Sequence, residues 1–130
     1  MTLRIVRLGS PRHPDEGLRI GTVRRPPRGV PKDRIAARDF YDVWFPNLAP
    51  SDEMLRWALA GQMDDKHWKA FARRYRAEMK SPENRRSLDL IAALSRRTSL
   101  SVGCYCADEA RCHRSLLRDL LVKQGAEIEP

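Results

Sequence analysis

The sequence predicts a single α/β domain over residues 1–130, with a small central sheet, mixed or mostly parallel, and helices packed on it. Three observations lead to this expectation. The 130 residues match the length of one ordinary domain. The hydrophobic content of 42% can build a core without disulfides or a structural metal. Segments with the period of a strand are separated by segments with the period of a helix, an order typical of sheets covered by helices.

The N-terminal third predicts strands and irregular loops. Residues 3–8 alternate apolar and cationic side chains, which indicates a strand with one buried face at a partly exposed edge of the sheet. Residues 18–23 form a second expected strand, and residues 40–45 a short one that ends before Pro46. Residues 24–29 cannot be helical because Pro26 and Pro27 lack amide donors. They predict a stiff, exposed loop that carries three guanidinium groups.

From residue 50 onward the period becomes helical. Ser51 is expected to cap a helix over residues 52–60, and a second helix begins near Asp64 or Asp65. Ser81 followed by Pro82 opens a third helix. Residues 98–105 form a strand near the centre of the sheet, and a last helix begins near residues 108–111 and stops at Gly125. The expected buried stripes are Trp68, Phe71, Ala72, Tyr75 and Met79 in the second helix, and Leu88, Ile91, Ala92 and Leu94 in the third.

The formal charge of +8 is unevenly distributed. Residues 1–38 carry ten Lys and Arg against three acids, a net charge of +7, while residues 39–130 carry fifteen against fourteen, a net charge of +1. Such a basic third can hold phosphate or nucleic acid. The alternative is a solvated basic face without a ligand, because twenty of the cations are Arg and a GC-rich genome favours Arg codons.

The chain carries no signal for a membrane or for export. No segment approaches the roughly 18 consecutive apolar residues of a membrane helix, and the first residues lack the apolar stretch of a signal peptide. The three cysteines cannot all pair within one chain, which favours a reducing compartment. We therefore expect a cytoplasmic protein without a membrane partner, whose oligomeric state the sequence leaves open.

Residues 104–114, Cys-Tyr-Cys-Ala-Asp-Glu-Ala-Arg-Cys-His-Arg, form the candidate site, between an expected strand and an expected helix. A helix N-terminus stabilises a thiolate and binds anions. Cys106 lies at the strand end, five residues before Arg111, a spacing similar to the Cys-loop-Arg arrangement of sulfurtransferases and low-molecular-weight phosphatases. The glycine-rich loop of those enzymes is missing, and Asp108 and Glu109 would repel a phosphate.

One hypothesis assigns a catalytic role to this loop. Cys106 would be the reactive thiol, and His113 would transfer a proton or orient the ligand. Positive charges would surround the anion. The cations given this role are Arg24 and Arg28 from the N-terminal loop, and Arg111 and Arg114 from the cysteine loop.

A second hypothesis is a metal site, for which zinc is the candidate ion. Its ligands would be Cys104, Cys106, Cys112 and His113, which lie within ten residues of one another. Cys104 and Cys106 share one face of a strand. Cys112 and His113 are adjacent, and on a helix they would diverge by about 100°, so three ligands meet more easily than four.

A third interpretation is purely structural. Cys104 would be a small buried apolar side chain, the commonest role of a free cysteine. Cys112 and His113 would be packing and capping residues in the first turn of the last helix.

Several stretches together resemble the YeaO-like branch of domain-of-unknown-function family 488. They are Arg24-x-x-Pro27-Arg-Gly29, residues 48–51, residues 55–57 and residues 68–78, and the tail Cys106-Ala-Asp…Cys112-His-Arg114 is similar to the cysteine-bearing members. The resemblance implies a compact α/β domain and transfers no established catalytic residue. Val23 stands where the branch has an acid, Pro26 where it has tryptophan, and the loop between Cys106 and Cys112 is about two residues shorter.

These observations leave three functions open. The leading one is a small enzyme or binding protein for a phosphate-bearing small molecule or nucleotide. The first alternative is a nucleic-acid-binding accessory domain that uses the basic N-terminal third. The second alternative is a metal-stabilised interaction module.

Overall fold

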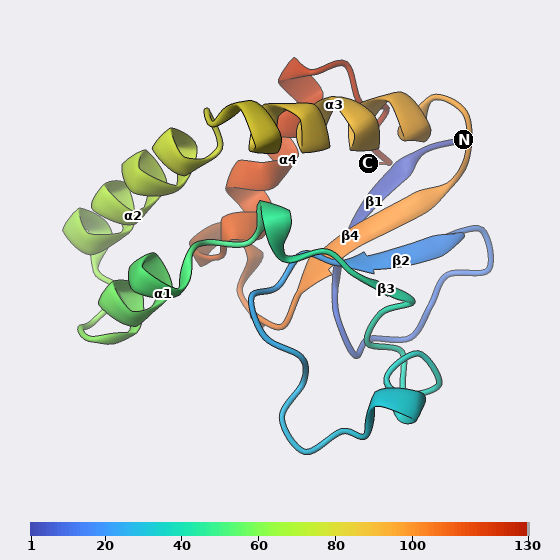
Figure 1. Cartoon of the computed structure of the whole chain (residues 1–130), viewed down its shortest axis with the longest axis horizontal. Helices are drawn as coiled ribbons and strands as arrows, with labels where there is room; N and C mark the ends of the chain where they lie inside the picture. The colour runs from blue at the N-terminus through green and yellow to red at the C-terminus, as the bar shows by residue number, and fades with distance from the viewer. Residues whose placement is uncertain (130) are drawn as a thin grey trace.

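The computed structural model describes residues 1–129 apart from the side chain of Glu109, and the strands form one four-stranded parallel sheet (Figure 1). The strands are β1 (Leu3–Arg7), β2 (Leu18–Gly21), β3 (Val43–Trp44) and β4 (Leu100–Cys104), in the order β1-β4-β2-β3. The predicted α/β class is confirmed, and the sheet is parallel throughout. The predicted edge position of the first strand and central position of the last one are also confirmed. The predicted domain includes Pro130, which lies outside the described residues.

Four helices complete the described part of the chain: α1 (Asp52–Leu59), α2 (Asp65–Glu78), α3 (Pro82–Ser95) and α4 (His113–Lys123). Ser51, Asp64 and Ser81 cap the first three, each accepting a hydrogen bond from the backbone amide three residues later. The predicted starts of these helices are therefore confirmed. No helix within residues 1–129 is long and apolar enough to cross a membrane.

The main core lies between the helices and one face of the sheet (Figure 1). The sheet contributes Leu3, Ile20, Leu100 and Val102. The helices contribute Phe71, Ala72 and Tyr75 from α2, Leu88 and Ile91 from α3, and Leu116, Leu117 and Leu121 from α4. Side chains alternate along a strand, so Arg19 and Ser101, which are neighbours in the β2–β4 register, lie on the opposite face.

Some predicted boundaries were wrong. Strand β2 is shorter than expected and ends at Gly21, where the amide and hydroxyl of Thr22 both donate to the carbonyl oxygen of Gly103. Leu94 is 36% exposed, because Ser95, seven residues after Leu88, takes the buried position on α3. Helix α4 begins at His113, later than expected, because residues Glu109–Arg111 form a separate 3-10 turn.

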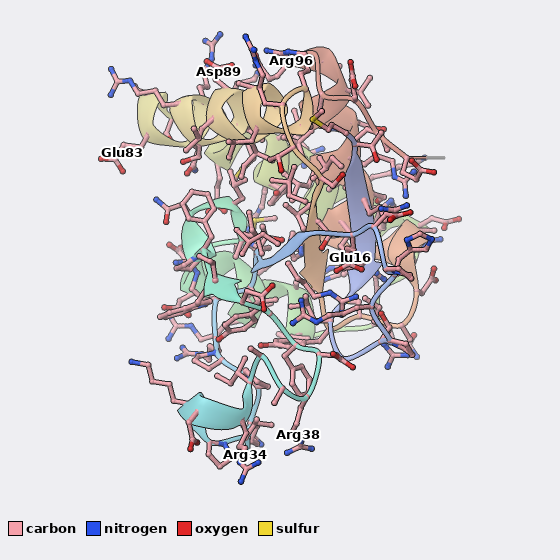
Figure 2. The ribbon with its side chains drawn as sticks, turned by 90° about the vertical axis from the view of Figure 1, so that its right-hand side faces the viewer. Glu16, Arg34, Arg38, Glu83, Asp89 and Arg96 are labelled. Carbon is pink, nitrogen blue, oxygen red and sulfur yellow. The ribbon has the colours of Figure 1, made fainter. Side chains whose placement is uncertain are left out.

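Irregular segments cover the face of the sheet that lies opposite the helices. Residues 8–17 connect β1 to β2 across β4, and Glu16 anchors this crossover by accepting hydrogen bonds from Arg19 and Ser101. Figure 2 shows Glu16 inside the fold, whereas Arg34 and Arg38 project from the tip of a loop. Because the strands are parallel, the loops that follow β2 and β4 leave the same edge of the sheet, and the start of α4 lies beside them.

Candidate functional site

A cavity of about 440 Å³ opens at the carboxyl ends of β2 and β4. This edge is where open parallel sheets usually bind ligands. The loop after β2 contributes one wall and includes Arg24, Arg25 and Arg28. The cysteine loop and the first residue of α4 contribute another. The chain between Pro50 and Phe71 closes the third side.

Three cysteine sulfurs gather in this cavity. The Sγ atoms of Cys104, Cys106 and Cys112 all lie within 4.8 Å of one another, and those of Cys104 and Cys106 are 3.7 Å apart. Cys104 ends β4, Cys106 lies two residues farther along, and Cys112 returns to them as the N-terminal cap residue of α4. All three are free thiols; Cys104 and Cys112 are buried, and Cys106 is exposed. The sulfurs are close enough to bind one metal ion.

The cluster favours a negative charge on the exposed sulfur. Hydrogen bonds from the Cys104 and Cys112 thiols, together with the positive charge of Arg114, lower the pKa of Cys106 despite its partial burial. The hydrogen bonds with Cys106 and Cys112, together with burial, raise the pKa of Cys104. Cys106 is therefore the member of the cluster that carries the charge.

His113 is oriented by the end of β2. Its Nε2 lies 2.8 Å from the carbonyl oxygen of Thr22, and its side chain is buried. A carbonyl oxygen can only accept, so Nε2 carries the proton and Nδ1 is left with a lone pair. Nδ1 lies 3.8 Å from Sγ of Cys112.

The predicted helical position of Cys112 was wrong, although the sulfurs that lie within 4.8 Å of one another are still those of the three cysteines, without His113. Cys112 precedes α4 and has extended backbone angles, φ −121° and ψ 151°. Its side-chain direction is therefore independent of the helical period, and both residues line the cavity.

Arg114 lies behind the cysteine loop and does not line the cavity. It is 4% exposed, its Nη2 donates to the carbonyl oxygen of Cys106 at 2.6 Å, and its Nε has no hydrogen-bond partner among the described residues. Within those residues it also forms no ion pair with a carboxylate. The structure thus brings Arg114 to the backbone of Cys106, whereas Arg24, Arg28 and Arg111 lie on the cavity wall with the Cys106 side chain.

The wall arginines differ in how firmly they are held. Arg24 donates to the carbonyl oxygens of Pro50 and Ala49 at 3.0 and 3.2 Å. Arg111 pairs with Asp65 at the start of α2. Arg28 is exposed and has no hydrogen bond or ion pair with any side chain or backbone group that the structure describes. Arg28 is consequently the cation most readily available to a ligand.

Sequence reasoning missed much of the apolar wall. Leu55, Ala58, Leu59 and Met63 line the cavity, and Phe71, expected only as a core residue, lines it too. The signal in the sequence was the apolar side chains Leu55, Ala58 and Leu59 within one short helix, followed by Met63.

Two polar wall residues were also overlooked. Arg25 lines the cavity and pairs with Asp52 at 2.9 Å, and the Tyr105 hydroxyl donates to the carbonyl oxygen of Arg25 at 2.9 Å. Tyr105 thereby joins the loop after β4 to the loop after β2.

Comparison with protein families gives one match. The family model DUF488-N3a, described as the active DUF488-N3 subclade, matches residues 3–125. The resemblance to family 488 is thereby confirmed, while the YeaO-like branch stays a prediction. No curated protein and no solved structure matches the chain.

Proposed function

This chain belongs to the DUF488-N3a family, and we propose that it binds a phosphate-bearing small molecule, such as a nucleotide, and acts on it through Cys106. The observation that carries the proposal is the placement of one exposed thiol and four arginines in a single cavity. The cavity lies at the edge of the sheet where parallel α/β proteins bind ligands.

The cavity matches such a ligand in size and in chemistry. Its volume of about 440 Å³ falls within the range of small-molecule sites. The apolar wall from Leu55 to Phe71 suits a base or another flat apolar group. Guanidinium groups bind phosphate through paired hydrogen bonds, and Arg28 can do so without leaving another partner. Arg25 and Arg111 would release their carboxylate partners, Asp52 and Asp65, in order to bind the phosphate.

The sequence objection to a phosphate is weakened by the position of Asp108. Its carboxylate accepts a hydrogen bond from the amide of Ala110, and it does not line the cavity. Repulsion by Asp108 of an anion bound among the arginines is correspondingly smaller than the linear sequence suggests, while the side chain of Glu109 lies outside the described part of the chain.

In the proposed reaction the thiolate of Cys106 attacks an electrophilic atom of the ligand. A bond forms from sulfur to that atom, and the displaced group leaves with the electron pair of the broken bond. His113 would accept or return a proton through Cys112, the residue that its Nδ1 contacts. Arg114 would act as a positioning residue, because it holds the backbone of Cys106.

The nucleic-acid alternative has less support. Arg12 of this segment pairs with Asp39 and Asp42, which lie outside residues 1–38. These two carboxylates offset part of the formal +7 of the segment, so the charge available to a phosphodiester backbone is smaller than that value.

Alkylation of the full chain with iodoacetamide, mapped by peptide mass spectrometry, tests the proposal. Cys106 should react first, and inorganic phosphate or adenosine monophosphate should protect it, compared with chloride at equal ionic strength. Arg28→Gln should weaken the protection, whereas Lys32→Gln, an exposed cation outside the cavity, should leave it unchanged. Equal reaction of the three cysteines, or no protection by either compound, would overturn the proposal.

A further inference from the structure

We propose that Cys104, Cys106, Cys112 and His113 form a zinc site at the base of this cavity, with three thiolates and the Nδ1 atom of His113 as ligands. The site goes beyond the ligand proposed for the cavity and can exist without it. Thiolate and imidazole groups are the donors that select zinc in proteins.

The sulfur spacing is that of a metal site. A tetrahedral ion with zinc–sulfur bonds of about 2.3 Å separates its sulfur ligands by about 3.8 Å. The Sγ atoms of Cys104 and Cys106 are 3.7 Å apart, and the third sulfur, that of Cys112, lies within 4.8 Å of both. A shift of about 1 Å or less in Cys112 therefore completes the sulfur triangle around an ion.

We assign His113 as the fourth donor, and its tautomer suits that role. Its ring lies outside the group of three sulfurs that are within 4.8 Å of one another, so Nδ1 would move toward Cys104 and Cys106 when the ion binds. Its Nε2 proton is directed to the carbonyl oxygen of Thr22 at 2.8 Å, so the lone pair is on Nδ1. Metal-binding histidines usually donate their other ring N–H in this way, which fixes the ring. Nδ1 already lies 3.8 Å from the Cys112 sulfur, near the separation of two ligands that share one ion.

The buried cation beside the cluster is an independent indication. Three thiolates, one neutral imidazole and Zn²⁺ carry a net charge of −1. Arg114 is 4% exposed, and among the described side chains, which do not include Glu109, its Nε has no partner and no carboxylate pairs with it. A buried arginine is stabilised by a negative charge close to it. An anionic metal cluster that includes the Cys106 sulfur, whose backbone carbonyl Arg114 binds, would keep such a charge beside this cation.

The metal site leaves the attack by Cys106 in place but replaces the proton transfer proposed for His113, because Nδ1 and the Cys112 sulfur would both be ligands. Cys106 is the exposed member of the cluster, so its sulfur faces the cavity while the other two sulfurs lie deeper. Coordination keeps a cysteine in its thiolate form, the same form that attacks a ligand.

Metal content and cobalt spectroscopy of the full chain, prepared without a polyhistidine tag, test the site. We expect one zinc per chain by mass spectrometry of the metal. Replacement by Co²⁺ should give the absorption of a tetrahedral ion with thiolate charge-transfer bands. Protein that binds neither Zn²⁺ nor Co²⁺ at stoichiometric amounts would overturn the inference.

Variants identify the ligands. Cys104→Ser, Cys106→Ser and Cys112→Ser should each lower zinc affinity at least tenfold, and His113→Gln should alter the cobalt spectrum. His67→Gln is the matched control, because His67 also bonds to a backbone carbonyl, that of Ala58, far from the cysteines in sequence. Unchanged spectra in the cysteine variants would contradict the site.

Wild-type protein gives a second readout if a variant fails to fold. Zinc should slow the reaction of all three thiols with a disulfide reagent, and a chelator should restore it; equal rates with and without chelator would overturn the inference. One bound metal without phosphate protection of Cys106 supports the metal site and overturns the proposed function. Phosphate protection of Cys106 in a protein that binds no metal supports the proposed function and overturns the metal site.

Discussion

Arg19 and Glu16 form a bidentate ion pair on the face of the sheet opposite the helices, with Nε and Nη2 of Arg19 lying 2.6 and 2.9 Å from the two carboxylate oxygens. Both side chains are buried. Ser101 of β4 also donates to Glu16, and Nη1 of Arg19 donates to the carbonyl oxygens of Ser10 and Asp39. The pair therefore ties two irregular segments to the two central strands.

Glu16→Gln should destabilise the protein strongly. The substitution keeps the size of the side chain but leaves the guanidinium of Arg19 buried without a counter-charge. Loss of one partner of a buried pair costs about 3 kcal/mol or more. Urea denaturation measures the change in free energy of unfolding. Asp15→Asn, at an exposed neighbour, is the control and should change stability by less than about 0.5 kcal/mol; similar losses in both variants would contradict the role of the pair.

Stability should fall in acid. Burial alone would raise the pKa of Glu16, but hydrogen bonds from Arg19 and Ser101 outweigh it, and the pKa is lowered from 4.5. The pKa of Asp42 is lowered from 3.8, because hydrogen bonds from Arg12 and the Arg19 amide likewise outweigh its burial.

The direction of this pH dependence follows from the linkage between proton binding and folding. A carboxylate with a lowered folded-state pKa stabilises the fold above its unfolded pKa, and the contribution is lost as pH falls through the folded pKa. The free energy of unfolding should therefore decline below about pH 4.5. The decline should be shallower in Glu16→Gln, and identical slopes for wild type and variant would rule out Glu16 as a source.

Gly103→Ala should destabilise the sheet. A Cβ at Gly103 would lie 2.6 Å from the carbonyl oxygen of Val6, which belongs to the adjacent strand. The backbone must shift, at a cost of about 2 kcal/mol. Gly61→Ala meets nothing within 4 Å and should be neutral. Thermal unfolding of the two variants checks this, and a neutral Gly103→Ala would show that the strands are farther apart than described.

The arginines should make Cys106 selective for a negative reagent. Iodoacetate and iodoacetamide have similar size and differ in charge. Relative to a small free thiol, Cys106 should favour iodoacetate, and Arg28→Gln should reduce the ratio of the two rates roughly two- to fivefold. The effect should diminish as salt is added. A ratio equal to that of the free thiol, with no change in the variant, would show that the cavity has no positive potential.

Local patterns determined the elements of the fold. Three kinds of pattern predicted these elements: the alternation in residues 3–8, the helix caps Ser51, Asp64 and Ser81, and the apolar stripe that includes Phe71 and Tyr75. Each depends on residues that are close together in the chain, so the sequence alone was enough to predict the element. The cysteine loop was located in the same way, since it follows an apolar strand and precedes a helix.

Tertiary structure decided what those local patterns could not. The short extent of β2, the separation of α4 from the 3-10 turn and the apolar wall after Pro50 depend on contacts between distant segments. The orientation of His113 depends on the carbonyl oxygen of Thr22, and the position of Arg114 on the backbone of Cys106.

The sequence by itself determined an α/β fold and one loop rich in sulfur, because secondary structure follows from periodicity and from helix caps. Only the tertiary structure decided that three cysteine sulfurs, the imidazole of His113 and four arginine side chains line one cavity, and that the imidazole has a single tautomer. The physical reason is that Cys112 is extended and parallel strands place their carboxyl ends at one edge, so residues more than eighty positions apart come into contact.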